Sequence, residues 1–460
     1  MPRTLPSSLL LAGIGLLPVG CGGGCGGGCG GGADGIPRPK NLLFVCVDTL
    51  RADHLGTYGA DPSPSPAIDG LAASGVVFER AYSHASWTLP SFAAILTSTY
   101  SSTNGCWTKE SRLGEDFTTL PERFRAAGFE TYGIASHIFF NDDYGLQQGF
   151  DDFDDEFCHV PEEQDWVPIT SPQVTEKALR WLALPERQER PWLLWLHYFD
   201  PHVPYVDHGE LAGGAAAEDE HAKYRSEIAF TDRHVGDLLL ALERLGFAHD
   251  TVVVFLADHG EAFEEHPGVT KHAKSLFDEE IRVPLVIRVP GFAPRRVRSF
   301  VRTVDLLPTL CELFDVPVGD VPIEGRSFRA GFSGEERDAP PLLSEIRLHE
   351  GFHLRSLIDG RYKLVEHVSR GGKLLFDLTK DPGERQDLAG EQAHLVRELT
   401  AEMEAIEERA SLAKERFGTA QRVELDPAAL DQLRKLGYVE GGAGEPTDGA
   451  TDPEKGPEER

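Results

Sequence analysis

The stretch that decides the fold is NLLFVCVD, residues 41–48, an apolar run that ends on an aspartate. An uninterrupted apolar run of this length is typical of a strand buried on both faces of a parallel sheet. Four comparable runs follow along the chain, with amphipathic segments at 173–184 and 226–246 between them. Alternating strands and helices predict an α/β fold with a doubly wound, mostly parallel sheet flanked by helices. The four further strands are expected at 130–136, 192–199, 251–258 and 283–289.

The pattern of apolar and polar residues changes after Gly325. Short alternating segments predict a small antiparallel sheet, and a charged helix is expected at roughly 390–416. We therefore expect a large α/β domain at 39–325 and a smaller C-terminal α+β subdomain at 326–438. Residues 439–460 are polar and rich in Gly, Pro and charge, and are expected to form a disordered tail.

The first residues indicate export. An apolar run from Leu9 to Val19 is typical of a signal-peptide core, so 1–20 is expected to be a signal peptide. It ends just before Cys21, a candidate for lipid attachment, and 21–38 is expected to be a Gly/Cys-rich linker. The predicted location is the periplasm or cell envelope, with a lipid anchor as an open alternative.

The formal net charge of the 460-residue chain is −30. A phosphate backbone needs a basic face, so nucleic acid is not an expected partner. An anionic small substrate is compatible with this charge, because a metal ion can reverse the local field inside one cleft.

Two predicted strands end in acids. Asp48 closes the first strand, and Asp258 with His259 closes another. Strand ends of a doubly wound sheet line the ligand crevice, and carboxylates with an imidazole suit a divalent cation. The alternative is that these aspartates cap the following helices, which is common.

Thr88 lies in SHASWTLPSFAAILTS, residues 83–98, just before a helix-like run. Pro90 fits the first turn of a helix, so Thr88 is expected to be the N-cap. The same position suits an anion near free amides, or a nucleophile whose pKa is lowered by a nearby metal.

The chain resembles the sulfatase family of the alkaline phosphatase superfamily over roughly residues 40 to 390. The resemblance implies hydrolysis or transfer of a sulfate or phosphate ester. It places metal ligands at Asp48, Asp258 and His259. It places the nucleophile at Thr88, which would also be a metal ligand. The matching blocks are NLLFVCVDTLRADHLGTYG, LAASGVVFERAYSHASWTLPS, FLADHGEAFEEH, LFDEEIRVPLVIRVPG, VRTVDLLPTLCELF and KLLFDLTKDPGERQDLAG.

The sequence departs from the family at three places. The family has Cys or Ser, oxidised to formylglycine, where this chain has Thr88, and Arg where it has Phe92. Oxidation of threonine would give a ketone, so no formylglycine is expected. The paired aspartates of the first block are reduced to Asp48 and Thr49.

Further candidates surround the same crevice. His202 and His272 are expected to be catalytic with Thr88, and Arg51, His137 and Lys274 to bind substrate. Lys274 is the runner-up to His272 for the family's anion-binding position. The alternative for Arg51 is pairing with surface carboxylates. The resemblance also offers His197 as a contact to the substrate anion, and a core histidine on its strand is at least as good an interpretation.

The function favoured at this point is a metal-dependent hydrolase of sulfate or phosphate esters, with phosphate mono- and diesters preferred because of Thr88. The cofactor would be one or more ions of Ca, Mg, Mn or Zn. The substrate would be an anionic small molecule, glycan or lipid head-group ester. The alternatives are sulfate-ester hydrolysis without formylglycine, transfer of a phospho group, and a silent member that binds an anionic glycan or lipid.

Overall fold

The computed structural model describes residues 38–159, 169–209, 219–337, 340–349, 351–436 and 438. The expected signal peptide, Cys21 and most of the linker, as well as the tail, lie outside these residues. The expected domain boundaries stay predictions.

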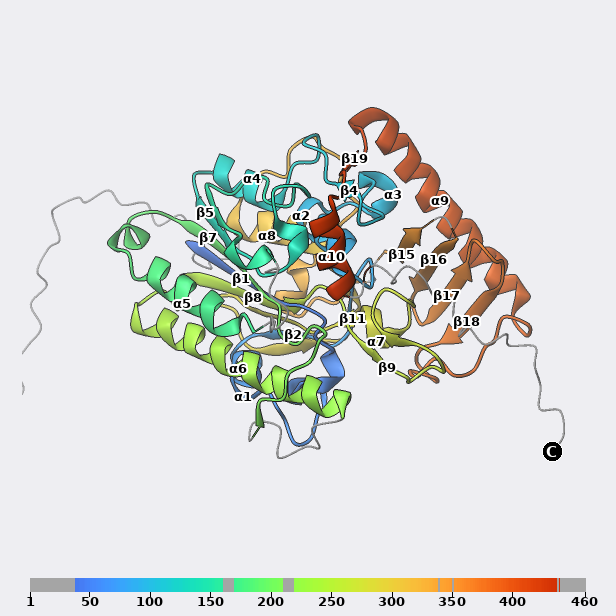
Figure 1. The fold of residues 1–460 in the computed structure, drawn as a ribbon, viewed down its shortest axis with the longest axis horizontal. Coiled ribbons are helices and arrows are strands. Elements are labelled where there is room, and N and C mark those ends of the chain that lie inside the picture. Colours follow the sequence, from blue (N-terminus) through green and yellow to red (C-terminus); the bar gives the residue numbers. More distant parts are fainter. Residues whose placement is uncertain are drawn as a thin grey trace, which may run out of the picture. The chain divides into compact units, whose positions relative to one another are not determined.

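The large sheet lies between two layers of helices (Figure 1). Helices α1 (Pro66–Ser74), α5 (Ser171–Leu182) and α6 (Glu220–Arg244) cover one face. Helices α2 (Thr88–Thr97), α4 (Leu120–Ala126) and α8 (Leu306–Phe314) cover the other. The predicted helices at 173–184 and 226–246 are α5 and α6. The strand order is β13 (Arg295–Val297), β2 (Val76–Phe78), β12 (Leu285–Arg288), β8 (Thr251–Ala257), β1 (Asn41–Val47), β7 (Trp192–Tyr198), β5 (Glu130–Ile134) and β6 (Asp152–Asp154).

β1 is central in this sheet, parallel to β7 on one side and β8 on the other. All seven of its residues are buried, as are those of β7 and β8. The apolar run at 41–47 is therefore explained as predicted: the strand is apolar throughout because both of its faces are covered. The α/β fold class with a mostly parallel sheet is confirmed.

The predicted strand at 283–289 exists as β12, but it runs antiparallel to both β8 and β2. Parallel neighbours need a crossover connection, usually a helix of several turns. Between β8 and β12 the chain forms only the four-residue helix α7 (Asp278–Ile281) and the two-residue strands β9 (Ala262–Phe263), β10 (Thr270–Lys271) and β11 (Arg282–Val283). β11 pairs with β3 (Ala81–Tyr82), which also pairs with β14 (Val301–Arg302).

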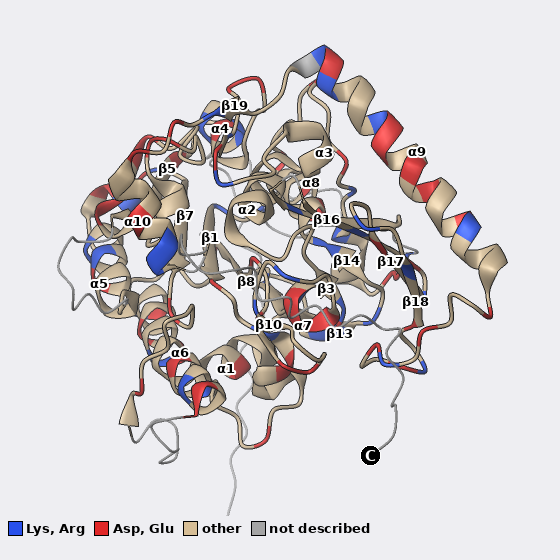
Figure 2. Cartoon of the chain, turned by 45° about the vertical axis from the view of Figure 1, so that its right-hand side comes forward, with Lys and Arg blue, Asp and Glu red and all other residues tan. Residues whose placement is uncertain are grey.

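The predicted C-terminal antiparallel sheet is present, with strands β15 (Leu342–His349), β16 (Phe352–Asp359), β17 (Tyr362–His367) and β18 (Lys373–Asp377). Helix α9 (Ala393–Phe417) lies across it, as expected for the charged segment. Its Leu399, Met403 and Ile406 pack with Leu343 and Leu357 of the sheet. Acidic and basic residues lie along the rest of α9 (Figure 2), which is therefore amphipathic.

After α9 the chain returns toward the large sheet. β19 (Gln421–Arg422) pairs with β4 (Ser111–Arg112), near helix α3 (Ser101–Asn104), and α10 (Pro427–Lys435) follows. Residues 418–436 together with Tyr438 are called the C-terminal strap below. Within the described residues, no helix is both long and apolar enough to cross a membrane.

Candidate active site

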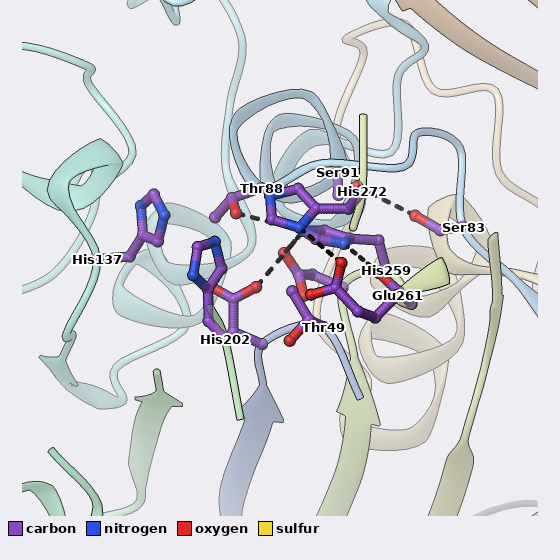
Figure 3. A network of polar contacts seen from close by, with 12 residues as sticks. Thr49, Ser83, Thr88, Ser91, His137, His202, His259, Glu261 and His272 are labelled. Carbon is purple, nitrogen blue, oxygen red and sulfur yellow. Dashed lines mark hydrogen bonds and ion pairs between the residues drawn. The ribbon is translucent and has the colours of Figure 1, made fainter. Parts of the chain in front are cut away.

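Two neighbouring strands bring the acids together. In the parallel register of β1 and β8, Val47 lies opposite Ala257, so Asp48 and Asp258 follow at the same sheet edge. Both aspartates and His259 have 0% exposure. Figure 3 shows β1 and β8 ending just below the labelled polar network. The strand-end arrangement predicted from sequence is therefore present.

His259 presents a free lone pair to this cluster. Its Nδ1–H donates to the Gly260 carbonyl over 2.9 Å, so Nε2 carries no proton in the neutral ring. Nε2 lies 3.4 Å from Asp48 Oδ1 and 3.4 Å from Asp258 Oδ2. Burial lowers the pKa of His259 well below its usual value, which keeps the ring neutral.

The two carboxyl groups lack donors. None of their four oxygens accepts a hydrogen bond from the described residues, although all four are buried. Burial raises the pKa of both carboxyl groups well above the ordinary range, and the charge of Asp48 raises that of Asp258 further. Orphaned carboxylates beside an imidazole lone pair form a donor set that fits a divalent cation, and with His259 they could hold one.

Thr88 joins this cluster as the first residue of α2. The expectation that it is the N-cap is wrong by one position, because Trp87 has the extended backbone of the cap (φ −160°, ψ 161°) and makes no side-chain cap. The Thr88 hydroxyl instead lies 3.4 Å from His259 Nε2 and 3.2 Å from the Tyr438 hydroxyl. It is fully buried, and its hydrogen-bond partners are His259 and Tyr438 rather than amides of the helix.

His137 and His202 lie beside this cluster (Figure 3) and differ in tautomer. His202 Nδ1–H donates to the Val203 carbonyl (2.6 Å), which leaves a lone pair on Nε2. His137 Nδ1 accepts the Phe139 N–H (3.2 Å), which leaves the proton on Nε2. Burial and neighbouring imidazoles hold the pKa of both rings well below its usual value. His137 therefore suits an anionic oxygen better than a cation.

His272 also lies beside the cluster, next to His202. Its ring centroid is 4.7 Å from that of His202 and 4.9 Å from that of His259. Its Nδ1 lies 3.3 Å from Oε1 of Glu261, a fully buried carboxylate that the sequence reasoning did not single out. The only signal was the DHGE string, which places Glu261 three residues after Asp258.

Two further predicted substrate-binding residues are Lys274 and Arg51, and Arg51 Nη1 donates to the backbone carbonyl of Glu261 over 3.0 Å. Lys274 is exposed, and its backbone N–H donates to Glu280. Arg51 is buried and pairs with Asp53 at 2.8 Å and with Glu265, the carboxylate pairing weighed as its alternative. Substrate contact by either residue stays a prediction.

Tyr438 was missed entirely. Its hydroxyl reaches Thr88 (3.2 Å), His202 (3.4 Å) and His137 (3.4 Å) from a position 350 residues beyond Thr88. No spacing or motif marked it, because it directly precedes the polar tail.

The chain is similar to known proteins over most of its length. Residues 40–316 match the family model named Sulfatase, and residues 271–409 match the model of the N-sulphoglucosamine sulphohydrolase C-terminal region. The delta 4,5-hexuronate-2-O-sulfatase of Bacteroides thetaiotaomicron is 27% identical over 424 residues, covering 76% of this chain and 84% of that protein. The sulfatase YidJ of Escherichia coli is 24% identical over 423 residues, covering 76% and 82%. The crystal structure of a phosphonate monoester hydrolase of Agrobacterium radiobacter superposes with a TM-score of 0.67 at 21% identity, covering 81% of this chain and 96% of that one.

Proposed function

Because the chain belongs to the sulfatase family and is a hydrolase of sulfate or phosphate esters, we propose that it is metal-dependent and uses Thr88 as its nucleophile. The observation that carries this proposal is the position of Thr88 Oγ1, 3.4 Å from His259 Nε2 and beside the orphaned oxygens of Asp48 and Asp258. A hydroxyl in such a place is close to the atoms that would hold a cation.

The described side chains have separate tasks in this proposal. A divalent cation held by Asp48, Asp258 and His259 would supply positive charge that lowers the pKa of the Thr88 hydroxyl. The Nε2–H of His137 would donate to an oxygen of the transferred group, because Phe139 fixes that tautomer. The Nε2 lone pair of His202 would take up a proton and return it to the leaving alcohol.

Phosphate mono- and diesters are the favoured substrates. A threonine cannot become formylglycine, whereas a threonine alkoxide can attack phosphorus and form an ester that water then hydrolyses. Relatives include a hexuronate sulfatase, which supports an anionic glycan, lipid head group or small ester as the substrate class.

The test compares purified protein with Thr88→Ala on phenyl phosphate, a phosphodiester and phenyl sulfate, each with Ca, Mg, Mn or Zn. Thr88→Ser serves as the matched control, because it keeps the hydroxyl. We expect metal-dependent phosphoesterase activity that is lost in Thr88→Ala and retained in part in Thr88→Ser. Unchanged activity in Thr88→Ala would refute the nucleophile, and Thr88-dependent sulfatase activity would refute the phosphate preference. Absence of turnover would favour a binding protein.

We also propose export to the periplasm or cell envelope with lipid attachment at Cys21, on the strength of the apolar run at 9–19. Fractionation of cells that express the full chain tests this proposal. We expect the protein with the membranes and a Cys21→Ala variant in the soluble exported fraction, whereas cytoplasmic recovery of both would refute export.

A further inference from the structure

The Tyr438 hydroxyl lies at the centre of the catalytic candidates. His137 Nε2–H donates to it, it donates to the lone pair of His202 Nε2, and its oxygen lies 3.2 Å from that of Thr88. The tautomers set by Phe139 and Val203 require this direction for the two histidines. The phenol hydroxyl therefore makes the hydrogen bonds that the alcohol released from an ester would make at this place.

The phenol ring is held in an aromatic box. Its centroid lies 5.1 Å from that of Phe139, 5.6 Å from that of His272 and 5.9 Å from that of Trp87. Rings at such distances pack favourably with each other. The box is thus aromatic on its sides, with polar groups at its inner end, and an aromatic lining with a few placed polar groups is the pattern of a small-molecule subsite.

Substrate and Tyr438 cannot occupy this place together. The oxygens of Thr88 and Tyr438 are 3.2 Å apart, a hydrogen-bonding distance that leaves no room for a phosphoryl or sulfuryl group between them. Thr88, His202 and Asp258 also have 0% exposure. An ester can reach Thr88 only if the side chain of Tyr438 leaves.

The C-terminal strap that carries Tyr438 is attached at few points. Its base is the two-residue pairing of β19 with β4, extended by the Val423 N–H bond to the Glu110 carbonyl (2.7 Å). The buried apolar side chains of the strap are Val423, Leu433 and Leu436, and Ala420 and Leu425 are packed in part against the core. Segments with so few buried contacts open at low free-energy cost relative to the core.

We propose that Tyr438 is an intramolecular occupant of the leaving-group subsite, and that this subsite binds the aromatic alcohol portion of an ester substrate once the strap withdraws. The side chain then acts as a competitor that belongs to the chain itself. The substrate class rests on the proposed ester hydrolysis, whereas occupancy of the subsite does not depend on turnover.

The first measurement is binding of phenol to the metal-loaded full chain by calorimetry, with cyclohexanol as the non-aromatic comparison. We expect Tyr438→Ala to bind phenol about tenfold more tightly than the wild type, because no closed state competes. The affinity of Tyr438→Ala for cyclohexanol should rise less than its affinity for phenol. Tyr438→Phe keeps the ring but loses the hydroxyl bonds, so its phenol affinity should lie between the two. Tyr362→Ala, a tyrosine change in β17, controls for loss of a tyrosine elsewhere and should match the wild type.

The second measurement is hydrolysis of phenyl phosphate, for which KM should fall about tenfold in Tyr438→Ala with kcat maintained. Phenol binding in Tyr438→Ala no tighter than in the wild type would overturn the inference. A lower kcat in both Tyr438 variants at unchanged KM would also overturn it, because Tyr438 would then take part in the chemistry. If no ester is hydrolysed but Tyr438→Ala gains phenol affinity, the proposed function fails while the subsite stands.

Discussion

The Oγ1 atom of Thr88 lies 3.4 Å from Nε2 of His259, although the two residues are 171 positions apart in the chain. The hydroxyl of Thr88 is therefore held at the group of atoms that could bind a cation. This relationship gives the first prediction. Thr88→Val replaces the hydroxyl by a methyl group of similar size, and should lower kcat by at least about 10³-fold.

The measurement for Thr88→Val is turnover of the best ester substrate beside a thermal unfolding curve. Thr88→Ser should keep a substantial share of activity, since it keeps the oxygen. An active Thr88→Val variant would show that another group attacks the ester. A large loss of thermal stability would instead point to a mainly structural role for the hydroxyl.

Asp48 and Asp200 provide a matched pair for the metal site. Both are buried and both follow strands, but Asp200 Oδ2 accepts bonds from the backbone and hydroxyl groups of Thr170 and Ser171. Asp200→Asn should cost stability and leave metal affinity unchanged. Asp48→Asn should weaken metal binding by at least about 100-fold, which corresponds to about 3 kcal/mol. Calorimetric titration measures both, and equal affinities in the two variants would reduce Asp48 to a structural role.

Metal removal should have a pH-dependent effect. In the metal-free fold, burial raises the pKa of Asp48 and Asp258 above their unfolded values, so the folded state binds more protons than the unfolded state. Their unfavourable contribution is absent at pH below the unfolded pKa of about 4 and grows as pH rises toward the folded pKa.

A bound cation removes that contribution because it replaces the protons. The rise in Tm on adding metal should therefore be larger at pH 8 than at pH 5. Thermal unfolding with metal and with a chelator at both pH values tests this. An equal Tm shift at both values, at saturating metal, would contradict the placement of the cation between these carboxylates.

The fold was readable from sequence where burial alone decides the pattern. Runs such as 41–47 and 251–257 are apolar throughout because both of their faces are covered. The direction of β12 was not readable, since a buried strand has the same composition whichever way it runs. Its direction depends on the short connection after β8.

The candidate site was readable where residues follow strand ends, as Asp48, Asp258 and His259 do. Glu261 and Tyr438 were not, for different reasons. Glu261 contacts His272 because the loop between them folds back, and the sequence does not specify the path of that loop. Tyr438 reaches the site through tertiary packing of the C-terminal strap, and a lone tyrosine before a polar tail carries no periodic signal.

Thr49 is strained next to Asp48. Its φ is 53°, a left-handed conformation that is costly for a β-branched residue, and its buried hydroxyl has no partner among the described residues. Thr49→Asn should raise stability by about 1 kcal/mol, because asparagine tolerates this conformation. Thr49→Asp should in addition strengthen metal binding, since it restores a second acid beside Asp48. Thermal unfolding and calorimetry of both variants test this, and equal metal affinities would mean that residue 49 does not face the cation.

Phe92, two residues after Pro90, is a second departure from the family's signature beside Thr88. It stands where the family has Arg, and its ring packs against Phe140 at 4.7 Å, His197 at 5.3 Å and Trp195 at 5.4 Å. Burial lowers the pKa of His197 to about 3, so this neighbour is neutral. A guanidinium placed among these three rings would be buried and would lose its hydration. Phe92→Arg should therefore destabilise the fold by about 3–5 kcal/mol, whereas the apolar control Phe92→Leu should cost about 1.5 kcal/mol or less. Chemical denaturation measures both, and an arginine variant as stable as the leucine variant would show that this site accommodates a guanidinium.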